Sequence, residues 1–188
     1  LMKKSKELLS KDIACARSNT VEVIEGVALT QAASCRLHIL DSKKRITTNK
    51  IRIISRNQHM MRLDAEMVND LDFVDEENLQ NQVQKFINTE KPDAVIFEDY
   101  NKGILTKSII ENTIAFCQKN NIISAVDPKR KNFFSYRNAT LFKPNLNEAI
   151  TGLNLLPEEV SPELLSNIHF QLKEQLEHSI SLITLSEK

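Results

Sequence analysis

Three short apolar runs, each followed at once by charged and amide residues, constrain the fold more than any other feature of this sequence. The runs cover residues 94–97, 122–126 and 139–142, and apolar residues at helical spacing occupy 106–117, 145–152 and 162–176. Short apolar runs that alternate with helices predict right-handed βαβ crossovers and a parallel sheet. We therefore predict an α/β fold with a mostly parallel sheet flanked by helices, in which the strand over 94–97 is buried on both faces.

Polar residues follow each predicted strand directly. In an open α/β sheet, ligands bind in the crevice beyond the carboxyl ends of the strands. The sequence therefore predicts a binding site at one sheet edge, and the lysines there indicate an anionic ligand. The residues that we expect at this edge are Asp99, Lys102, Asp127, Lys129, Lys143 and Asn145.

Other segments differ from this alternating pattern. Residues 45–64 hold β-branched and basic residues and predict two strands joined near Asn57, partly exposed on one face. We expect a β ribbon there, an incomplete α/β core over 65–188 that ends in a strand at 180–185, and an unassigned N-terminal segment over 1–44. That segment is expected to hold a helix over 4–16 and a strand over 21–24.

Composition narrows the class of protein. The chain has 188 residues, 41% hydrophobic and 27% charged, which is normal for a globular domain. Lys plus Arg and Asp plus Glu number 25 each, so nothing in the net charge favours a nucleic-acid or membrane partner. Three unevenly spaced cysteines and no long apolar run predict a cytoplasmic protein without disulfides. Three glycines are too few for a dinucleotide-binding or P-loop motif.

The segment from Asn145 to Glu148 has two interpretations. An Asn followed three residues later by Glu is a helix-capping arrangement. The same amide and carboxylate, behind Lys143 at a strand end, can also serve a nucleotide phosphate and its hydrated Mg²⁺.

The turns at Asp99–Gly103 and Asp127–Lys129 likewise fit either plain surface turns or a ligand site. Receiver domains of response regulators also place Lys-Pro after a strand. Asp127 and Lys143 are too close in sequence for the sheet of a receiver, so we reject that alternative.

Taken together, these motifs resemble the ribokinase-type carbohydrate kinases. The most similar subgroup phosphorylates D-glycero-D-manno-heptose 7-phosphate in ADP-heptose synthesis, a step toward lipopolysaccharide. The resemblance covers about residues 45–188 and rests on Arg45-x-Thr47-x-x-Lys50-x-Arg52, Arg62-x-Asp64, Glu98–Gly103, Asp127-Pro128-Lys129, Tyr136–Leu141, Pro144–Glu148 and Thr184–Lys188.

The resemblance implies an enzyme that transfers the γ-phosphoryl group of ATP, with Mg²⁺, to a sugar phosphate. Implied nucleotide contacts are Lys143, Asn145, Glu148, Thr184 and Ser186, of which Asn145 and Glu148 hold Mg²⁺ through water. Implied sugar-phosphate contacts are Lys50, Arg52, Asp99 and Lys102, with Asp127 and Lys129 as phosphate contacts. The ribbon is implied to act as a lid and as the contact of a homodimer.

Two segments of the family are absent from this sequence. They are the glycine-rich sugar-binding segment and the G-A-G-D motif, which carries the general base. We therefore expect the chain to be truncated at both ends relative to the family and these 188 residues alone to be inactive. The alternatives are a kinase for another sugar phosphate and a non-catalytic nucleotide-binding remnant.

Overall fold

The structure is a computed structural model that describes residues 38–185 apart from 57 and 158. The helix and strand expected within 1–24, and Ser186, lie outside the described residues. The chain divides into two compact units, Leu1–Val68 and Asn69–Lys188, and each is considered by itself.

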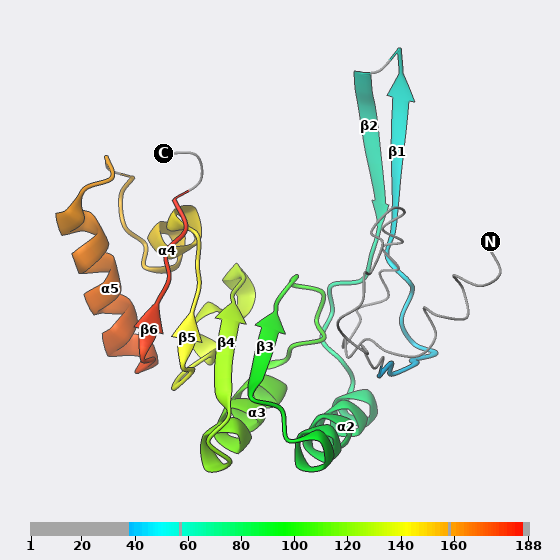
Figure 1. Ribbon diagram of the computed structural model, residues 1–188. Coiled ribbons are helices and arrows are strands. Elements are labelled where there is room, and N and C mark those ends of the chain that lie inside the picture. Colours follow the sequence, from blue (N-terminus) through cyan, green and yellow to red (C-terminus); the bar gives the residue numbers. More distant parts are fainter. Residues whose placement is uncertain (1–37, 57, 158, 186–188) are drawn as a thin grey trace, which may run out of the picture. The chain divides into compact units, whose positions relative to one another are not determined.

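The second unit is an α/β structure built around a four-stranded sheet (Figure 1). The strand order is β3-β4-β5-β6, and every neighbouring pair is parallel. This confirms the predicted fold class. The elements in chain order are α2 (Phe73–Glu90), β3 (Ala94–Glu98), α3 (Lys107–Lys119), β4 (Ile123–Asp127), the 3₁₀ helix η1 (Arg130–Ser135), β5 (Leu141–Phe142), α4 (Leu146–Gly152), α5 (Pro162–Leu176) and β6 (Ile180–Ser181).

Side-chain caps set the starts of the helices. Thr106 accepts a hydrogen bond from the Ile109 N–H at the start of α3, and Ser161, with a proline next to it, caps α5. Asp72 caps α2, because its Oδ1 accepts a hydrogen bond from the Asp75 N–H at 2.9 Å.

The core lies on one face of the sheet. Phe97, Val126 and Phe142 occupy neighbouring register positions on that face and are almost fully buried. Side chains of α3, η1, α4 and α5 pack against them, chiefly Ile110, Ile114, Phe133, Tyr136, Ile150, Ile168, Leu172 and Leu176. These four helical elements thus share a single apolar layer with the strands.

The opposite face of the sheet differs from the prediction. Ile96 and Ile180 stand at the two ends of a register row through Ala125 and Leu141, and they are 68% and 52% exposed. The expectation that β3 is buried on both faces was therefore wrong for the described part of the chain. The physical reason is that the core-forming helices of this unit pack on the other face.

The last strand is shorter than the predicted run over 180–185. Only Ile180 and Ser181 form ladder pairs, and further along Thr184 makes an isolated parallel bridge to Asn145. Pro144 has no N–H to donate at this point, so the ladder between the two segments is interrupted. The backbones nevertheless continue side by side, because the Thr184 N–H donates to the Pro144 carbonyl at 3.1 Å.

The first unit contains an antiparallel ribbon of β1 (Asn49–Ser55) and β2 (Gln58–Ala65). The strand pair and the position of its turn confirm the prediction for residues 45–64. Every residue of both strands is exposed, however, so exposure on one face only was wrong. Among the described residues of this unit the two strands pair only with each other, and a two-stranded hairpin by itself has no second layer that would bury either face.

Candidate active site at the carboxyl edge of the sheet

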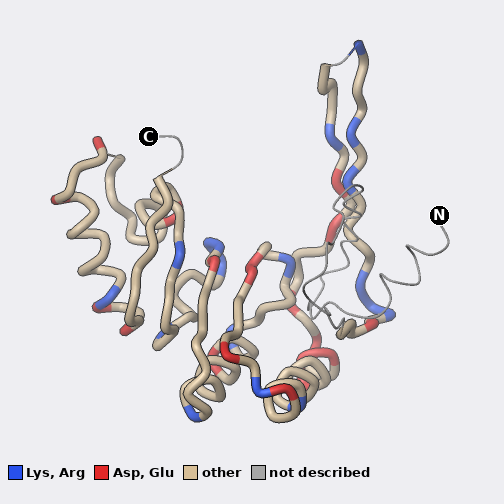
Figure 2. The backbone as a smooth tube through the Cα atoms, in the orientation of Figure 1, with Lys and Arg blue, Asp and Glu red and all other residues tan. Residues whose placement is uncertain are grey.

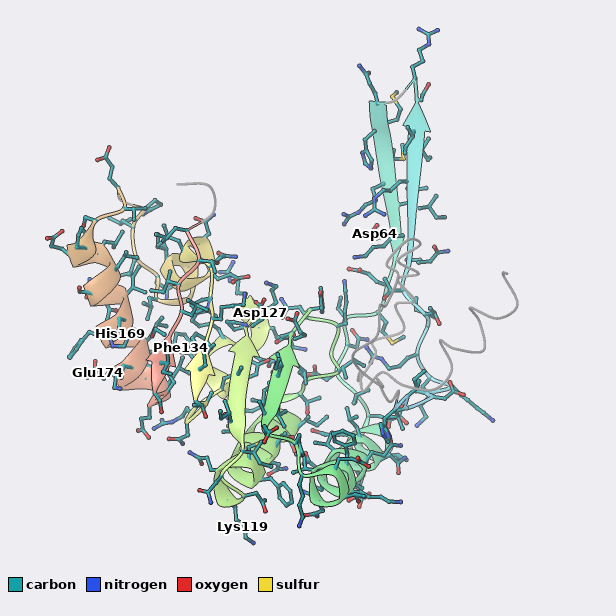
Figure 3. The ribbon with its side chains drawn as sticks, viewed as in Figure 1. Asp64, Lys119, Asp127, Phe134, His169 and Glu174 are labelled. Atoms are coloured by element: carbon teal, nitrogen blue, oxygen red, sulfur yellow. The ribbon has the colours of Figure 1, made fainter. Side chains whose placement is uncertain are left out.

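The carboxyl ends of the strands in the second unit bring the predicted site residues to one edge. Glu98 and Asp127 are register partners, and the Asp99 N–H donates to the Asp127 carbonyl at 3.2 Å. The Lys143 N–H donates to the Val126 carbonyl at 2.8 Å. Figure 3 labels Asp127 at this edge, and Figure 2 shows acidic and basic residues gathered at the ends of β3 and β4. The predicted placement at one sheet edge is therefore confirmed.

Four of these residues form a chain of alternating charge. Lys143 Nζ lies 2.7 Å from Asp127 Oδ2, and Lys129 Nζ lies 3.7 Å from Asp127 Oδ1. The same Lys129 ammonium group lies 2.5 Å from Glu148 Oε1. Their side chains are between 18% and 36% exposed, so the network is half-buried and reachable from solvent. It joins the segment after β4, which holds Asp127 and Lys129, to the segment after β5, which holds Lys143 and Glu148.

The charge network also affects the protonation of Lys129. Partial burial disfavours its ammonium form. The hydrogen bond to Glu148 and the charges of Glu148, Asp127 and Asp99 outweigh burial and raise the pKa of Lys129. This lysine is therefore a fixed positive charge over the whole physiological pH range.

Asn145 and Glu148 form a complete capping box at the start of α4. Asn145 Oδ1 accepts from the Glu148 N–H at 2.8 Å, and Glu148 Oε2 accepts from the Asn145 N–H at 2.9 Å. The capping interpretation weighed from the sequence is thus present. It occupies only one carboxylate oxygen of Glu148, and Oε1 faces Lys129.

Asp99 is placed at the edge but turns into the core. The residue is 4% exposed, and its Oδ2 accepts from the buried Tyr136 hydroxyl at 2.9 Å. Its Oδ1 accepts from the Asn101 N–H at 2.8 Å. Burial and the Asp99 charge both raise the pKa of Tyr136, so the phenol stays protonated and donates. This pair anchors the loop after β3.

The rest of that loop is fixed by a glycine. Gly103 has a φ of +74°, and a Cβ added there would lie 1.9 Å from the Asn69 carbonyl oxygen. The Gly103 carbonyl also accepts from the Leu71 N–H at 3.0 Å. Lys102, next to it, is partly buried at the same loop. The loop therefore packs closely against the backbone of Asn69 to Leu71, at a position where only glycine fits.

The remaining predicted residues are divided between the two units. Thr184 is at the edge in the second unit, because its carbonyl accepts from the Leu146 N–H at 3.0 Å. Lys50 and Arg52 lie in β1 of the first unit, opposite Asp64 and Arg62.

The carboxylates at the edge suit a hydrated divalent cation. The Lys129 ammonium group lies between the two, 3.7 Å from Asp127 Oδ1 and 2.5 Å from Glu148 Oε1. Within the residues that the structure describes, no set of three or more His, Cys, Asp or Glu could hold a metal ion. Two carboxylates, completed by water and phosphate oxygens, are a usual environment for Mg²⁺.

Sequence reasoning did not predict the pairings themselves. Tyr136 was noted as part of a motif, but its contact with Asp99 was not foreseen. Nor were the ion pairs of Asp127 with Lys143 and of Glu148 with Lys129. The signal available was only that these residues follow strands of one sheet.

Comparison with known proteins places this geometry in a fold family. No protein-family model matches the chain. Among solved structures, the tetrameric inhibited form of phosphofructokinase-2 from Escherichia coli superposes with a TM-score of 0.58 at 14% identity, covering 80% of this chain and 49% of that one. Ribokinase from Giardia lamblia gives 0.56 at 15% identity, covering 81% and 49%.

The chain therefore has the fold of the ribokinase-type carbohydrate kinases, which confirms the resemblance found in its motifs. By sequence it is related to the bifunctional proteins HldE. It is 35% identical over 152 residues to the one from Sulfurimonas denitrificans and 37% identical over 153 residues to the one from Helicobacter pylori strain Shi470. Each match covers 80% of this chain, which spans about a third of the relatives' length, 31% and 32% respectively.

Proposed function

We propose that the sheet edge binds ATP with Mg²⁺ and takes part in phosphoryl transfer to a sugar phosphate. The observation that carries this proposal is the alternating network of Lys143, Asp127, Lys129 and Glu148 at the strand ends of a ribokinase-type fold. Phosphoryl transfer depends mainly on positioning and charge neutralisation, which two lysines and two carboxylates can supply.

Each residue has a proposed task. Lys143 and Lys129 neutralise phosphate oxygens. Asp127 positions both ammonium groups when no nucleotide is bound. Glu148 would hold the hydrated Mg²⁺, while its Oε2 keeps Asn145 and the start of α4 in place. Thr184 lies beside Asn145 and is proposed to contact the nucleotide. Mg²⁺, when bound, supplies charge that offsets the phosphates.

The substrate is proposed to be D-glycero-D-manno-heptose 7-phosphate, which would be converted to the 1,7-bisphosphate. Support comes from the motif resemblance and from the sequence relatives. Lys50, Arg52, Asp99 and Lys102 stay predicted contacts of the sugar phosphate. Asp99 would need to release Tyr136 to make such a contact, which favours Lys102 among the residues of its loop.

The first experiment separates ligand binding from helix capping. Glu148→Gln keeps an oxygen that can cap the helix but removes the charge that would attract Mg²⁺. We expect it to weaken Mg-ATP binding by about tenfold, near 1.4 kcal/mol, in calorimetric titration. The folded protein should melt close to the wild-type temperature.

Ser161→Ala is the matched control, since Ser161 caps α5 through the Leu164 N–H at 3.1 Å and lies outside the network. Losing that cap should lower stability by about 1 kcal/mol and leave the affinity for Mg-ATP unchanged. Equal affinities for Glu148→Gln and wild type would leave Glu148 with its capping role alone.

A further inference from the structure

We propose that the Lys129 ammonium group acts as a counter-cation for Asp127 and Glu148 in the empty site. It occupies the position of the divalent cation and moves away from the two carboxylates when the metal–nucleotide complex binds. This inference rests on the proposed function and describes how the same site changes when it is loaded. It assigns Lys129 the role of compensating the two carboxylates in the empty site. This role differs from that of Lys143, although both are lysines at the same edge.

The contacts of the two carboxylates carry the argument. Glu148 Oε2 is taken by the Asn145 N–H at 2.9 Å, and Asp127 Oδ2 is taken by Lys143 at 2.7 Å. Lys129 lies against the remaining oxygen of each, at 2.5 Å from Glu148 Oε1 and 3.7 Å from Asp127 Oδ1. The two oxygens best placed to attract a divalent cation therefore already share a cation, which belongs to the chain itself.

Charge balance explains why such a lysine is useful. Without Lys129, the carboxylates of Asp127 and Glu148 would face one another with only Lys143 as compensation. Two half-buried like charges at short range are costly. An ammonium group on a flexible four-carbon stem can neutralise both in the empty site and still move away. Lys129 is 36% exposed, so its stem has room on the solvent side.

Exchange of the two cations predicts coupling between metal and nucleotide. A metal ion alone must displace Lys129 and leave its charge without a partner. A metal ion with a nucleotide brings phosphates that accept the displaced ammonium group. Metal binding should therefore be weak by itself and much stronger with nucleotide present, because the two ligands share the cost of moving Lys129.

The test uses Mn²⁺ as a probe, with free ion measured by electron paramagnetic resonance on the full 188-residue chain. Lys129→Met keeps most of the stem and removes the charge. We expect it to bind Mn²⁺ alone about tenfold more tightly than wild type does. The gain in Mn²⁺ affinity on adding ADP should be smaller in this variant. Lys129→Gln is a second variant, in case methionine disturbs the packing.

Lys131→Met is the matched control. Lys131 lies two residues further along, in η1, and pairs with Asp70 at 2.6 Å instead of with the site carboxylates. Its substitution should leave both Mn²⁺ affinities as in wild type.

The outcomes distinguish this inference from the proposed function. If both Lys129 variants bind Mn²⁺ alone no more tightly than wild type while ADP still binds, the counter-cation role is refuted and the proposed function stands. If they bind Mn²⁺ more tightly but no protein binds ADP with or without Mn²⁺, the exchange stands and the proposed function fails.

Discussion

At the residue scale, the charged side chains at the sheet edge form ion pairs with one another. Asp127 is paired with two lysines, and Glu148 is shared between a backbone N–H and Lys129. Pairs with this degree of exposure contribute about 0–1 kcal/mol each. Pairs of this strength can exchange partners when a ligand supplies replacement charges.

His178 gives a prediction that belongs to one residue. It is 1% exposed, its ring lies 5.7 Å from that of Phe142, and its Nε2 is bonded to Ser181 Oγ at 2.5 Å. Its Nδ1 is buried without a hydrogen-bond partner. Burial first, and then the charges of His169 and Lys173 on α5, lower the pKa of His178 to about 4.

The lowered pKa makes stability depend on pH. The unfolded chain takes up a proton near pH 6.5 and the folded chain only near 4, so stability is complete above pH 6.5 and falls as the pH drops toward 4. Between pH 7 and pH 5 we expect a loss of about 1 to 2 kcal/mol from this group, measured by urea unfolding. His178→Asn should lose less over this interval.

His59→Gln is the control, because His59 is exposed in β2 of the first unit and is not among the groups that lower the pKa of His178. It should keep most of the pH dependence. An equal loss of stability in wild type and His178→Asn would contradict the assignment.

At the scale of elements, the ribbon of the first unit is amphipathic. Ile51 pairs with Leu63 and Ile53 with Met61, so these four side chains share one face and are 44% to 51% exposed. Lys50, Arg52, Arg62 and Asp64 share the other face, where Arg62 and Asp64 form a bidentate ion pair at 2.6 and 2.9 Å. A two-stranded ribbon is marginal in water, so its apolar face favours a covering partner.

The predicted partner is a second copy of the chain. Ile53→Lys places a charge in the middle of the apolar face and should shift the protein toward the monomer in sedimentation velocity. Arg52→Gln changes the neighbouring residue on the charged face and should leave the oligomeric state unchanged. A wild-type protein that sediments as a monomer at high concentration would contradict a homodimer through the ribbon.

At the scale of the molecule, the described residues form two units. The match to the solved structures covers about half of the length of each of those chains. None of the described helices is long and apolar enough to cross a membrane. The sequence has no G-A-G-D segment, and Asp99 is held by Tyr136 in the core. The described edge offers charge neutralisation, but Asp99 is poorly placed to accept a proton from a substrate hydroxyl.

We therefore predict that these 188 residues bind Mg-ATP without useful turnover. Absence of a positioned base typically lowers the rate by about 10² to 10⁴, and each missing anion-stabilising donor by about 10² to 10³. ADP release would be followed with heptose 7-phosphate and Mg-ATP. Robust turnover abolished by Asp127→Asn or Asp99→Asn would refute this prediction and locate the base. A site that binds nucleotide without turnover would also fit the non-catalytic alternative.

The sequence by itself determined the features that depend on neighbours along the chain. Apolar runs set the strands, Ser161 and the Asn145–Glu148 box set helix starts, and strand ends set the site edge. Tertiary structure alone decided which charges pair, because Lys129 and Glu148 are 19 residues apart and Tyr136 and Asp99 are 37 apart. It also decided which face of the sheet is covered. A short apolar strand has the same sequence pattern whether helices pack on one of its faces or on both.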